Sequence, residues 1–336
     1  MYNSYIKGIG HYLPDNVVTN ADLEKIMDTT DEWIRERTGI EERRWVKEGD
    51  GDTGSVMGAK AARAAIADAG IDKSEIDFII FATLSPDLYF PGNGVLVEQE
   101  LGLNNIGALD IRNQCSGFIY GLSVADQFVK TGMYKNILLI GSELHSGALD
   151  KTTRGRNVSV IFGDGAGAAV ISRAPEGHKG ILASCMHSQG EHHSELAIMR
   201  PSTSFWLDKY LAMEDPDDGG SWRPYMNGNF VFKHAVTRMP EAIGEVLQKA
   251  QMPPEAIDLV IPHQANLRIS QMVQRLFKLP DDKVYNNIQK VGNTTAGSIP
   301  IALSQARDEG KAKRGDLLCL TAFGAGFTWG ATLLEF

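Results

Sequence analysis

The sequence predicts an α/β fold built from two similar halves, with mixed sheets covered by helices on both faces. The first observation is an internal repeat, since residues 62–80 and 243–261 each place a helix, a short turn, an Ile-Asp pair and an apolar strand at matching offsets. The second is that both halves end alike, because a glycine-rich turn runs into an apolar strand at 162–171 and at 323–334. Strands that alternate with helices in this way are typical of covered sheets.

Each half is expected to supply its elements in the same order. The repeated segments begin with apolar residues at three- and four-residue spacing, which is typical of a helix with one buried face. Continuous apolar runs at 78–81 and 259–261 then predict buried strands. Further strands are expected at 106–111, 136–142 and 316–322. The halves should span residues 1–175 and 176–336.

An irregular insertion is predicted at about 191–227, within the second half. The segment is rich in Pro, Gly, Asp, Ser and Trp, and long irregular loops often carry function. The residues in it that suggest a metal site are Glu191, His192, His193 and Glu195. Because adjacent histidines point apart on a regular element, solvated loop residues are the favoured interpretation and no metal site is expected.

The composition excludes several classes of protein. With 336 residues, 43% hydrophobic and 22% charged, the chain can bury a large core. A net charge of −9 disfavours a broad surface for nucleic acid or anionic membranes. No apolar run approaches the roughly 18 residues that span a bilayer, and no secretion signal is seen. Three distant cysteines make neither a disulfide framework nor a zinc motif, so a cytoplasmic protein is expected.

Two glycine-rich strings at 163–167 and 324–326 raise the question of a nucleotide site. A dinucleotide fingerprint needs G-x-G-x-x-G at the start of a helix, whereas apolar strand residues follow both strings here. The glycines are therefore interpreted as turns that allow close backbone approach.

Cys115 heads a segment whose apolar residues follow helical spacing. The N-terminus of a helix stabilises a thiolate and lowers the pKa of the thiol, so this is a position suited to a nucleophile. Most isolated cysteines are small buried residues, and from this feature alone that interpretation stays open.

His263 directly follows the predicted strand at 258–261, and Asn293 lies in a loop of small residues before a helix at 301–307. Catalytic groups favour strand ends in α/β sheets. A hydrogen-bonded core histidine or a helix-capping asparagine would explain each residue singly. Together, a Cys, a His and an Asn supply one nucleophile and two hydrogen-bond donors.

Several strings together resemble the β-ketoacyl-acyl-carrier-protein synthase III family, in the family's order and over nearly the whole chain. The strings lie at 31–34, 37–40, 113–118 (Asn-Gln-Cys-Ser-Gly-Phe), 162–167, 226–229, 262–268 (Pro-His-Gln-Ala-Asn-Leu-Arg), 292–294 and 323–330. The resemblance implies a thiolase-like fold, in which two duplicated α/β halves form α-β-α-β-α layers with mixed five-stranded sheets. The active site is then expected between the halves.

The chemistry that the resemblance implies is a decarboxylative Claisen condensation in fatty-acid or related lipid or polyketide synthesis. Cys115 would take an acyl group from acyl-CoA as a thioester, and malonyl on acyl carrier protein would lose CO₂ and attack it. His263 and Asn293 would stabilise the resulting enolate. The backbone N–H groups of Cys115 and Ala325 would form the oxyanion hole. Acyl-CoA and malonyl carrier protein are substrates, and no cofactor or metal is needed.

Further contacts follow from the same resemblance. The CoA-binding residues would be Trp33, Arg37, Arg154, Gly228 and Asn266, with the adenine between Trp33 and Arg154. A basic patch for the acidic carrier protein would consist of Lys233, Arg268 and Arg275. Phe90 would reach across a homodimer interface to close the partner's acyl pocket, and Phe232 is assigned to the same pocket.

Departures from the family pattern keep alternatives open. Ala325 replaces the middle glycine of the family's frequent Gly-Gly-Gly string, although the backbone donor survives. The unusual insertion favours, as alternatives, acyl transfer to a hydroxyl or amine, or head-to-head condensation of two acyl thioesters. A non-catalytic carrier-binding subunit is disfavoured by the presence of Cys115, His263 and Asn293. A thiolase is disfavoured because thiolases that resemble this chain use a second cysteine as the base near the C-terminal glycine loop. Here that loop has no cysteine, and Cys319 lies upstream of it in an apolar run.

Overall fold

The computed structural model describes residues 2–202, 211 and 222–336. The α-helices are α1 (Asn20–Leu23), α2 (Asp31–Thr38), α3 (Gly54–Ala69), α4 (Asn93–Leu101), α5 (Gly117–Lys130), α6 (Arg156–Ser159), α8 (Gly228–Ala250), α9 (Leu267–Leu276), α10 (Ile288–Val291) and α11 (Ser298–Asp308). Short 3₁₀ turns are η1 (Lys73–Glu75), η2 (Gln114–Ser116), η3 (Thr153–Gly155), η4 (Gly190–His192), η6 (Pro254–Ala256), η7 (Asp281–Lys283) and η8 (Thr295–Gly297).

The strands are β1 (Ser4–Tyr12), β2 (Val17–Thr19), β3 (Glu42–Arg44), β4 (Phe78–Ala82), β5 (Gly107–Ile111), β6 (Asn136–Glu143), β7 (Gly165–Arg173), β8 (Ile181–Ser188), β9 (Leu196–Ala197), β10 (Tyr225–Met226), β11 (Leu259–Pro262), β12 (Leu317–Gly324) and β13 (Thr328–Glu335). The predicted runs at 78–81, 106–111, 136–142, 259–261 and 316–322 correspond to β4, β5, β6, β11 and β12. Local apolar patterning was sufficient to place them.

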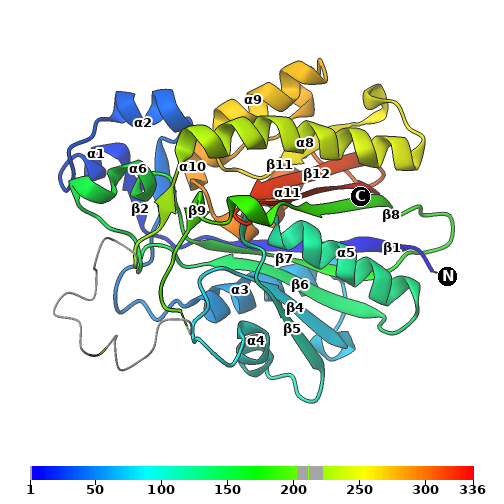
Figure 1. Cartoon of the computed structure of the whole chain (residues 1–336). Helices are drawn as coiled ribbons and strands as arrows, with labels where there is room; N and C mark the ends of the chain where they lie inside the picture. Colours follow the sequence, from blue (N-terminus) through cyan, green and yellow to red (C-terminus); the bar gives the residue numbers. More distant parts are fainter. Residues whose placement is uncertain (1, 203–210, 212–221) are drawn as a thin grey trace.

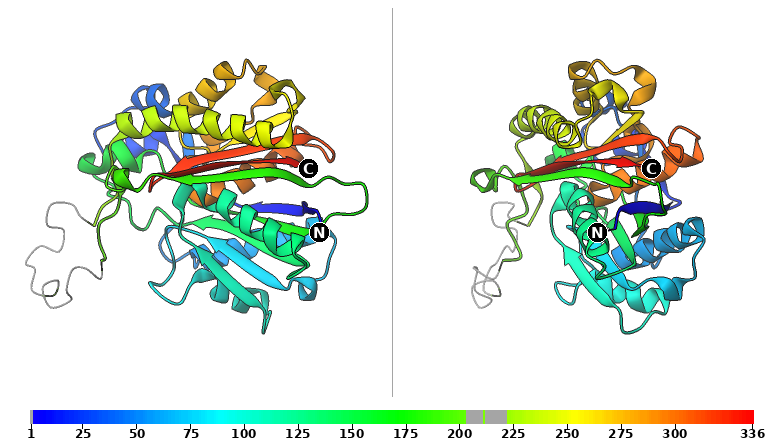
Figure 2. Two further views of the ribbon diagram at one scale, coloured as in Figure 1. Left: turned by 45° about the vertical axis from the view of Figure 1, so that its right-hand side comes forward. Right: turned by 90° about the vertical axis from the view of Figure 1, so that its right-hand side faces the viewer.

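The elements form five layers, as the resemblance implied (Figure 1). Two sheets lie one above the other with α5 and α11 between them. Helices α8 and α9 cover the upper sheet, and α3 and α4 cover the lower one, which the two turned views of Figure 2 also show. The predicted α-β-α-β-α arrangement is confirmed.

The two main sheets share one strand order. The lower sheet runs β1-β7-β6-β4-β5 and the upper one β8-β13-β12-β11. In each, a parallel pair (β4 with β6, β11 with β12) is followed by an antiparallel pair (β6 with β7, β12 with β13). This correspondence matches the repeat seen in the sequence, while the exact division at residue 175 stays a prediction.

The upper sheet differs from the expected five strands. Among the described residues it has four, and the fifth place holds only an isolated parallel bridge between Val260 and Val284. After Tyr285 N–H donates to Val260 O at 3.0 Å, the backbone N–H of Asn287 donates to the side chain of Gln264 at 3.1 Å instead. The ladder ends because the chain turns toward that side chain.

One core joins both halves. The largest cluster of buried apolar side chains includes Phe118 and Leu122 from α5, Leu303 from α11, Leu139 from β6 and Leu320 from β12. Burying each such side chain stabilises the fold by roughly 1.5–3 kcal/mol. Because the middle helices pack on both sheets, the fold holds residues of both halves at fixed positions between the sheets.

The insertion is described only at its two ends. There β9 and β10 form a two-stranded sheet, and the ring of His192 packs against the rings of Phe230 (5.0 Å between centroids) and His234 (4.8 Å). Residues 203–210 and 212–221 of the predicted insertion lie outside the described part. In the described chain, no helix combines the length and apolar character needed to cross a bilayer.

Candidate active site

Residues from distant parts of the chain meet at η8 and at the first residue of α11. Thr295 N–H donates to Oδ1 of Asn293 at 2.8 Å, and the Thr295 hydroxyl hydrogen-bonds the thiol of Cys115. The Ser298 hydroxyl lies 2.6 Å from Nδ1 of His263. The structure therefore brings together the three residues that the sequence singled out, around a turn that sequence reasoning did not recognise.

The turn can lie close to β6 because residue 141 is glycine. A Cβ atom at Gly141 would lie 2.2 Å from the carbonyl oxygen of Ala296 and 3.0 Å from the backbone nitrogen of Gly297. No side chain fits such a gap. Gly141 therefore permits the contact that sets the position of η8 between the two halves.

Cys115 occupies the middle of η2, directly before α5, and is 7% exposed. The backbone N–H groups of Cys115 and Ala325 both lie next to its sulfur and oppose the rise of its pKa. Ala325 lies in the turn between β12 and β13, so the two halves of the molecule supply one donor each. Two N–H groups thus converge on the sulfur at the start of a helix.

The environment of the thiol corrects one sequence-based expectation. The helix N-terminus was expected to lower the pKa of Cys115, but burial raises it to about 12, and the nearby Glu143 carboxylate adds to the increase. The N–H groups of Cys115 and Ala325 and the Thr295 hydroxyl lower the pKa and so act in the opposite direction. Burial outweighs these donors because a charged sulfur loses its hydration in the interior.

Glu143 is a functional candidate that sequence reasoning missed. It ends β6 with no exposed surface, and it accepts hydrogen bonds from Leu84 N–H, Ala296 N–H and the Ser85 hydroxyl, among others. Burial raises the pKa of this carboxyl to about 7. A lone acidic residue ending the apolar run of a strand was the signal available in the sequence.

His263 follows β11, as expected, and is 2% exposed. Burial lowers its pKa to about 3, so the imidazole is neutral near pH 7. Nδ1 is occupied by Ser298, whereas Nε2 is buried and has no hydrogen-bond partner in the described part of the chain. A buried polar atom without a partner costs roughly 1–3 kcal/mol, which a bound ligand can recover by pairing with it.

Asn293 lies between α10 and η8 and is 5% exposed. Its backbone pairs with the glycine string, since Asn293 N–H donates to Ile161 O and Gly163 N–H donates to Asn293 O. Its side-chain oxygen accepts from Thr295, so the amide nitrogen is the group that Asn293 offers to a ligand. Gly163, the first glycine of the string at 163–167, thus helps to hold the loop that carries Asn293.

One aromatic and two basic side chains lie together on the surface formed by α2 and α6. The guanidinium of Arg37 lies 4.5 Å from the ring centroid of Trp33, and that of Arg156 lies 5.2 Å from it. Arg154, chosen from the sequence because of its Arg-Gly pair, instead directs Nε to Asp150 at 2.8 Å. Arg154 and Arg156 are only two residues apart, and on a short helical turn their side chains point in different directions. The sequence alone did not show which of them lies near Trp33.

Helix α9 joins this surface to α8. Asn266 Nδ2 donates to Arg37 O at 2.7 Å, and Asn266 caps α9 through the N–H of Arg268. The guanidinium of Arg268 lies 5.3 Å from the ring centroid of Phe232, next to the exposed Lys233. Trp33, Arg37, Arg156, Lys233 and Arg268 are called the basic surface below.

The remaining expected residues are Gly228, Arg275, Phe90 and Phe232. Gly228 begins α8, and Arg275 is exposed toward the end of α9. Phe90 is 80% exposed and lies between β4 and α4. Phe232 lies under Arg268, so the structure gives Phe90 and Phe232 different surroundings.

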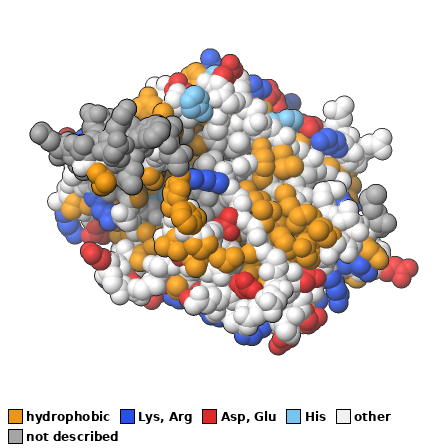
Figure 3. Space-filling model, turned by 60° about the horizontal axis from the view of Figure 1, so that its bottom comes forward, with side chains coloured by type: hydrophobic (Ala, Val, Ile, Leu, Met, Phe, Trp, Pro, Cys, Tyr) orange, Lys and Arg blue, Asp and Glu red, His pale blue; other side chains and the backbone are white. Residues whose placement is uncertain are grey.

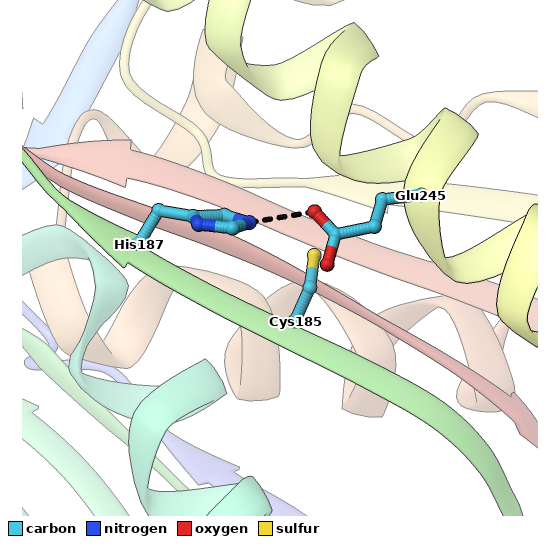
Figure 4. A group of neighbouring side chains, drawn as sticks. All are labelled: Cys185, His187 and Glu245. Carbon is cyan, nitrogen blue, oxygen red and sulfur yellow. Dashed lines mark hydrogen bonds and ion pairs between the residues drawn. The ribbon is translucent and has the colours of Figure 1, made fainter.

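A second polar cluster links β8 to α8 (Figure 4). In the described chain, Cys185, His187 and Glu245 are the group whose potential metal-binding atoms lie within 4.8 Å of one another. His187 Nε2 pairs with Glu245 at 2.6 Å, and Lys249 pairs with the other carboxylate oxygen at 2.9 Å. Burial raises the pKa of Cys185 to about 11, so its thiol keeps a proton. Since the Lys249 ammonium would repel a cation, we interpret the cluster as a contact between strand and helix.

Comparisons with known families give a consistent result. A family model described as 3-oxoacyl-[acyl-carrier-protein (ACP)] synthase III matches residues 109–190, and its C-terminal counterpart matches 247–336. The β-ketoacyl-[acyl-carrier-protein] synthase III of Aquifex aeolicus (strain VF5) is 47% identical over 98% of this chain and 99% of its own. The protein of that name from Caldanaerobacter subterraneus is 43% identical over 98% and 97%.

Solved structures agree with the sequence comparisons. The crystal structure of 3-oxoacyl-[acyl-carrier-protein] synthase III from Aquifex aeolicus VF5 superposes with a TM-score of 0.89, covering 99% of this chain and 100% of that one at 46% identity. The priming β-ketosynthase of the R1128 polyketide pathway superposes with a TM-score of 0.89 at 32% identity, over 99% and 96%. OleA of Xanthomonas campestris, at 19% identity and a TM-score of 0.83 over 100% and 98%, shares the fold.

Proposed function

The chain belongs to the 3-oxoacyl-[acyl-carrier-protein] synthase III family, and from this premise we propose how its own residues perform the family's condensation. It is an acyltransferase of the β-ketoacyl-acyl-carrier-protein synthase III type, with a thiolase fold and a function in fatty-acid biosynthesis. The observation that supports the assignment of residues is the convergence of Cys115, His263 and Asn293 on η8 and the start of α11.

In the first half-reaction, the Cys115 sulfur attacks the carbonyl carbon of an acyl-CoA. A new S–C bond forms, the bond to the CoA sulfur breaks, and the proton of the Cys115 thiol ends on the CoA sulfur. The negative charge on the carbonyl oxygen is stabilised by the N–H groups of Cys115 and Ala325, which already converge at the sulfur. Such donors are effective because they are oriented before the charge develops.

In the second half-reaction, a malonyl group on acyl carrier protein loses CO₂, and its α-carbon forms a bond to the carbonyl carbon of the acyl thioester. The bond from that carbon to the Cys115 sulfur breaks, the 3-oxoacyl carrier protein leaves, and the Cys115 thiolate takes up a proton. Decarboxylation leaves an enolate oxygen, which needs donors in a site without water. His263 Nε2, which is buried and has no partner among the residues that the structure describes, supplies one donor, and the amide nitrogen of Asn293 supplies the other. His263 stays neutral through this step, since its lowered pKa keeps a second proton off the ring.

The basic surface is the place where both large substrates would bind. A flat base can lie against the Trp33 indole beside the guanidinium of Arg156, so we assign the CoA adenine to this pair. Arg154, held by Asp150, and Gly228 stay predicted contacts. Lys233, Arg268 and Arg275 are exposed cations on neighbouring helices, suited to an acidic carrier protein.

A homodimer would cover the lower edge of the molecule. Strand β5 is the last strand of its sheet, and Leu88, Tyr89, Phe90 and Leu109 are exposed on or near it. Hydrophobic side chains gather on this lower face in Figure 3. Open sheet edges and apolar patches of this kind are usually covered by a partner, and a second copy would place Phe90 against its neighbour.

Neither half-reaction uses a cofactor, because the charges that develop are stabilised by N–H groups. We also place the enzyme in the cytoplasm. Cys115, Cys185 and Cys319 are all unpaired, which suits a reducing compartment.

The assignment is tested by incubating the protein with acyl-CoAs of different chain lengths and mapping acylation by mass spectrometry. The expected result is a single acyl group on the peptide that contains Cys115, followed by CO₂ release when malonyl carrier protein is added. Cys115→Ser should carry no acyl thioester, and the matched variant Cys185→Ser should behave as the native protein. Absence of an adduct with every acyl-CoA would refute the proposed nucleophile.

A further inference from the structure

A second buried histidine, His145, lies beside the candidate nucleophile. Its Nε2 is 2.9 Å from the Thr295 hydroxyl oxygen, and that hydroxyl also hydrogen-bonds the Cys115 thiol. His145 is 6% exposed and Thr295 has no exposed surface. A continuous chain of hydrogen bonds therefore links His145, Thr295 and Cys115 across residues far apart in the sequence.

We propose that His145 is a positioning residue that orients the Thr295 hydroxyl, and that Thr295 donates to the Cys115 sulfur and stabilises its thiolate. In this arrangement neutral His145 donates Nε2–H to the Thr295 oxygen. The hydroxyl proton of Thr295 then points to the sulfur, because the oxygen lone pair that faces His145 is already used. The inference rests on the proposed role of Cys115 as nucleophile.

The charge state of His145 permits this direction of the chain, in the tautomer that carries its proton on Nε2. Burial lowers the pKa of His145 to about 3, so the ring is neutral and can act as donor at only one of its nitrogens. The charged groups near it are Asp164, which accepts the backbone N–H of His145 at 2.7 Å, and Glu143, two residues earlier on β6. Neither carboxylate hydrogen-bonds the ring, so neither competes for its Nε2–H.

The position of Thr295 is fixed by its neighbours. Its backbone adopts φ +47° and its N–H donates to Asn293, which fixes the backbone of Thr295, while the contact of its hydroxyl with His145 sets the direction of the side chain. His145 is held in turn by packing of its ring on Phe162, at 4.7 Å between centroids. His145 and Thr295 are thus both ordered before substrate binds, which favours the hydrogen-bonded chain from His145 through Thr295 to Cys115.

The thiolate needs such a donor in this protein. Burial and the Glu143 carboxylate both disfavour a negative sulfur, and the two backbone N–H groups that face it are needed later for the carbonyl oxygen. A side-chain donor can stay with the sulfur throughout the step. Thr295 is the side chain that the structure places there.

The test measures the thiol directly, through the pH dependence of alkylation of Cys115 by iodoacetamide, with the modified peptide identified by mass spectrometry. His145→Leu and Thr295→Val should each raise the pKa of Cys115, so that alkylation near neutral pH slows about tenfold. His145→Gln and Thr295→Ser keep an N–H and a hydroxyl, and each should react close to the native rate. The double variant His145→Leu with Thr295→Val should be no slower than Thr295→Val.

Two results would overturn the proposal. The first is an unchanged pH profile in His145→Leu. The second is equal slowing in His145→Leu and His145→Gln at native melting temperature, which would indicate that the ring only fills space. Because alkylation requires no acyl-CoA, this test stays separate from the acylation experiment that tests the proposed function.

Discussion

Gly324 packs directly on Cys115. A Cβ atom at Gly324 would lie 2.6 Å from Cβ and 3.1 Å from Sγ of Cys115, so a side chain there would displace the sulfur. Gly324 is the last residue of β12, and Cys115 belongs to the opposite half of the chain. The position of the Cys115 sulfur is thus limited by a glycine of the other half. The sulfur has no room to move toward Gly324.

Gly324→Ala is therefore expected to impair acylation far more than folding. The added methyl group must displace the Cys115 side chain or β12, at a cost of roughly 1–3 kcal/mol in the free energy of unfolding. A shift of the sulfur by about 1 Å should slow acylation on the order of 100-fold. Single-turnover acylation followed by mass spectrometry measures this. Gly244→Ala is the control, since nothing lies within 4 Å of its added Cβ, and it should acylate normally.

His263→Ala and Asn293→Ala should separate the two half-reactions. Both residues are proposed to stabilise the enolate, so release of CO₂ from malonyl carrier protein should fall roughly 100- to 1,000-fold in each variant. Acylation of Cys115 should stay largely intact, because its proposed oxyanion donors are backbone groups. The exposed His193→Ala serves as control. If acylation fell as far as decarboxylation in both variants, the proposed division of labour would be incorrect.

Glu143→Gln should lower the pKa of Cys115. Glu143 has a pKa of about 7, so above that pH its negative charge opposes formation of the thiolate, and the amide removes this charge. Alkylation of Cys115 should therefore be several-fold faster in the variant above pH 7 and closer to native below it. The exposed Glu255→Gln should change nothing. A slower reaction of Glu143→Gln at high pH would contradict the prediction.

Leu109→Lys should dissociate the proposed homodimer. Leu109 lies on the open edge strand β5 and is 37% exposed, and a buried ammonium without a partner would oppose association through that edge. Light scattering should give about half the native mass. Leu276→Lys, at the end of α9 and 56% exposed, should keep the native mass. Equal masses for the native protein and both variants would argue against this interface.

Arg268→Glu should weaken recognition of the carrier protein. The change reverses one charge of the basic surface, so KM for malonyl carrier protein should rise several-fold and become less dependent on salt. Acylation from a saturating acyl-CoA should be little affected. Arg63→Glu on α3, which covers the opposite sheet, is the control. An unchanged KM would exclude Arg268 from the carrier site.

Most of the architecture was predictable because its signals are local. The buried strands at 78–81 and 259–261 were recognised as short apolar runs, and the repeat predicted two similar halves. The missing fifth strand was not predictable, because it depends on Gln264 taking the N–H of Asn287. Whether a backbone N–H donates to a side chain or to a neighbouring strand is decided only when the two segments meet in the folded chain.

The sequence alone determined the family and the layered fold, and it singled out Cys115, His263 and Asn293 as candidate residues, because each lies in a string with its own local signature. The tertiary structure decided the electrostatics of the site. Burial raised the pKa of Cys115 where the helix N-terminus predicted a decrease, and packing placed Arg156 over Trp33. It also joined His145 to Thr295 across the two halves. These properties depend on solvent exclusion and on contacts between distant segments, which exist only in the folded chain.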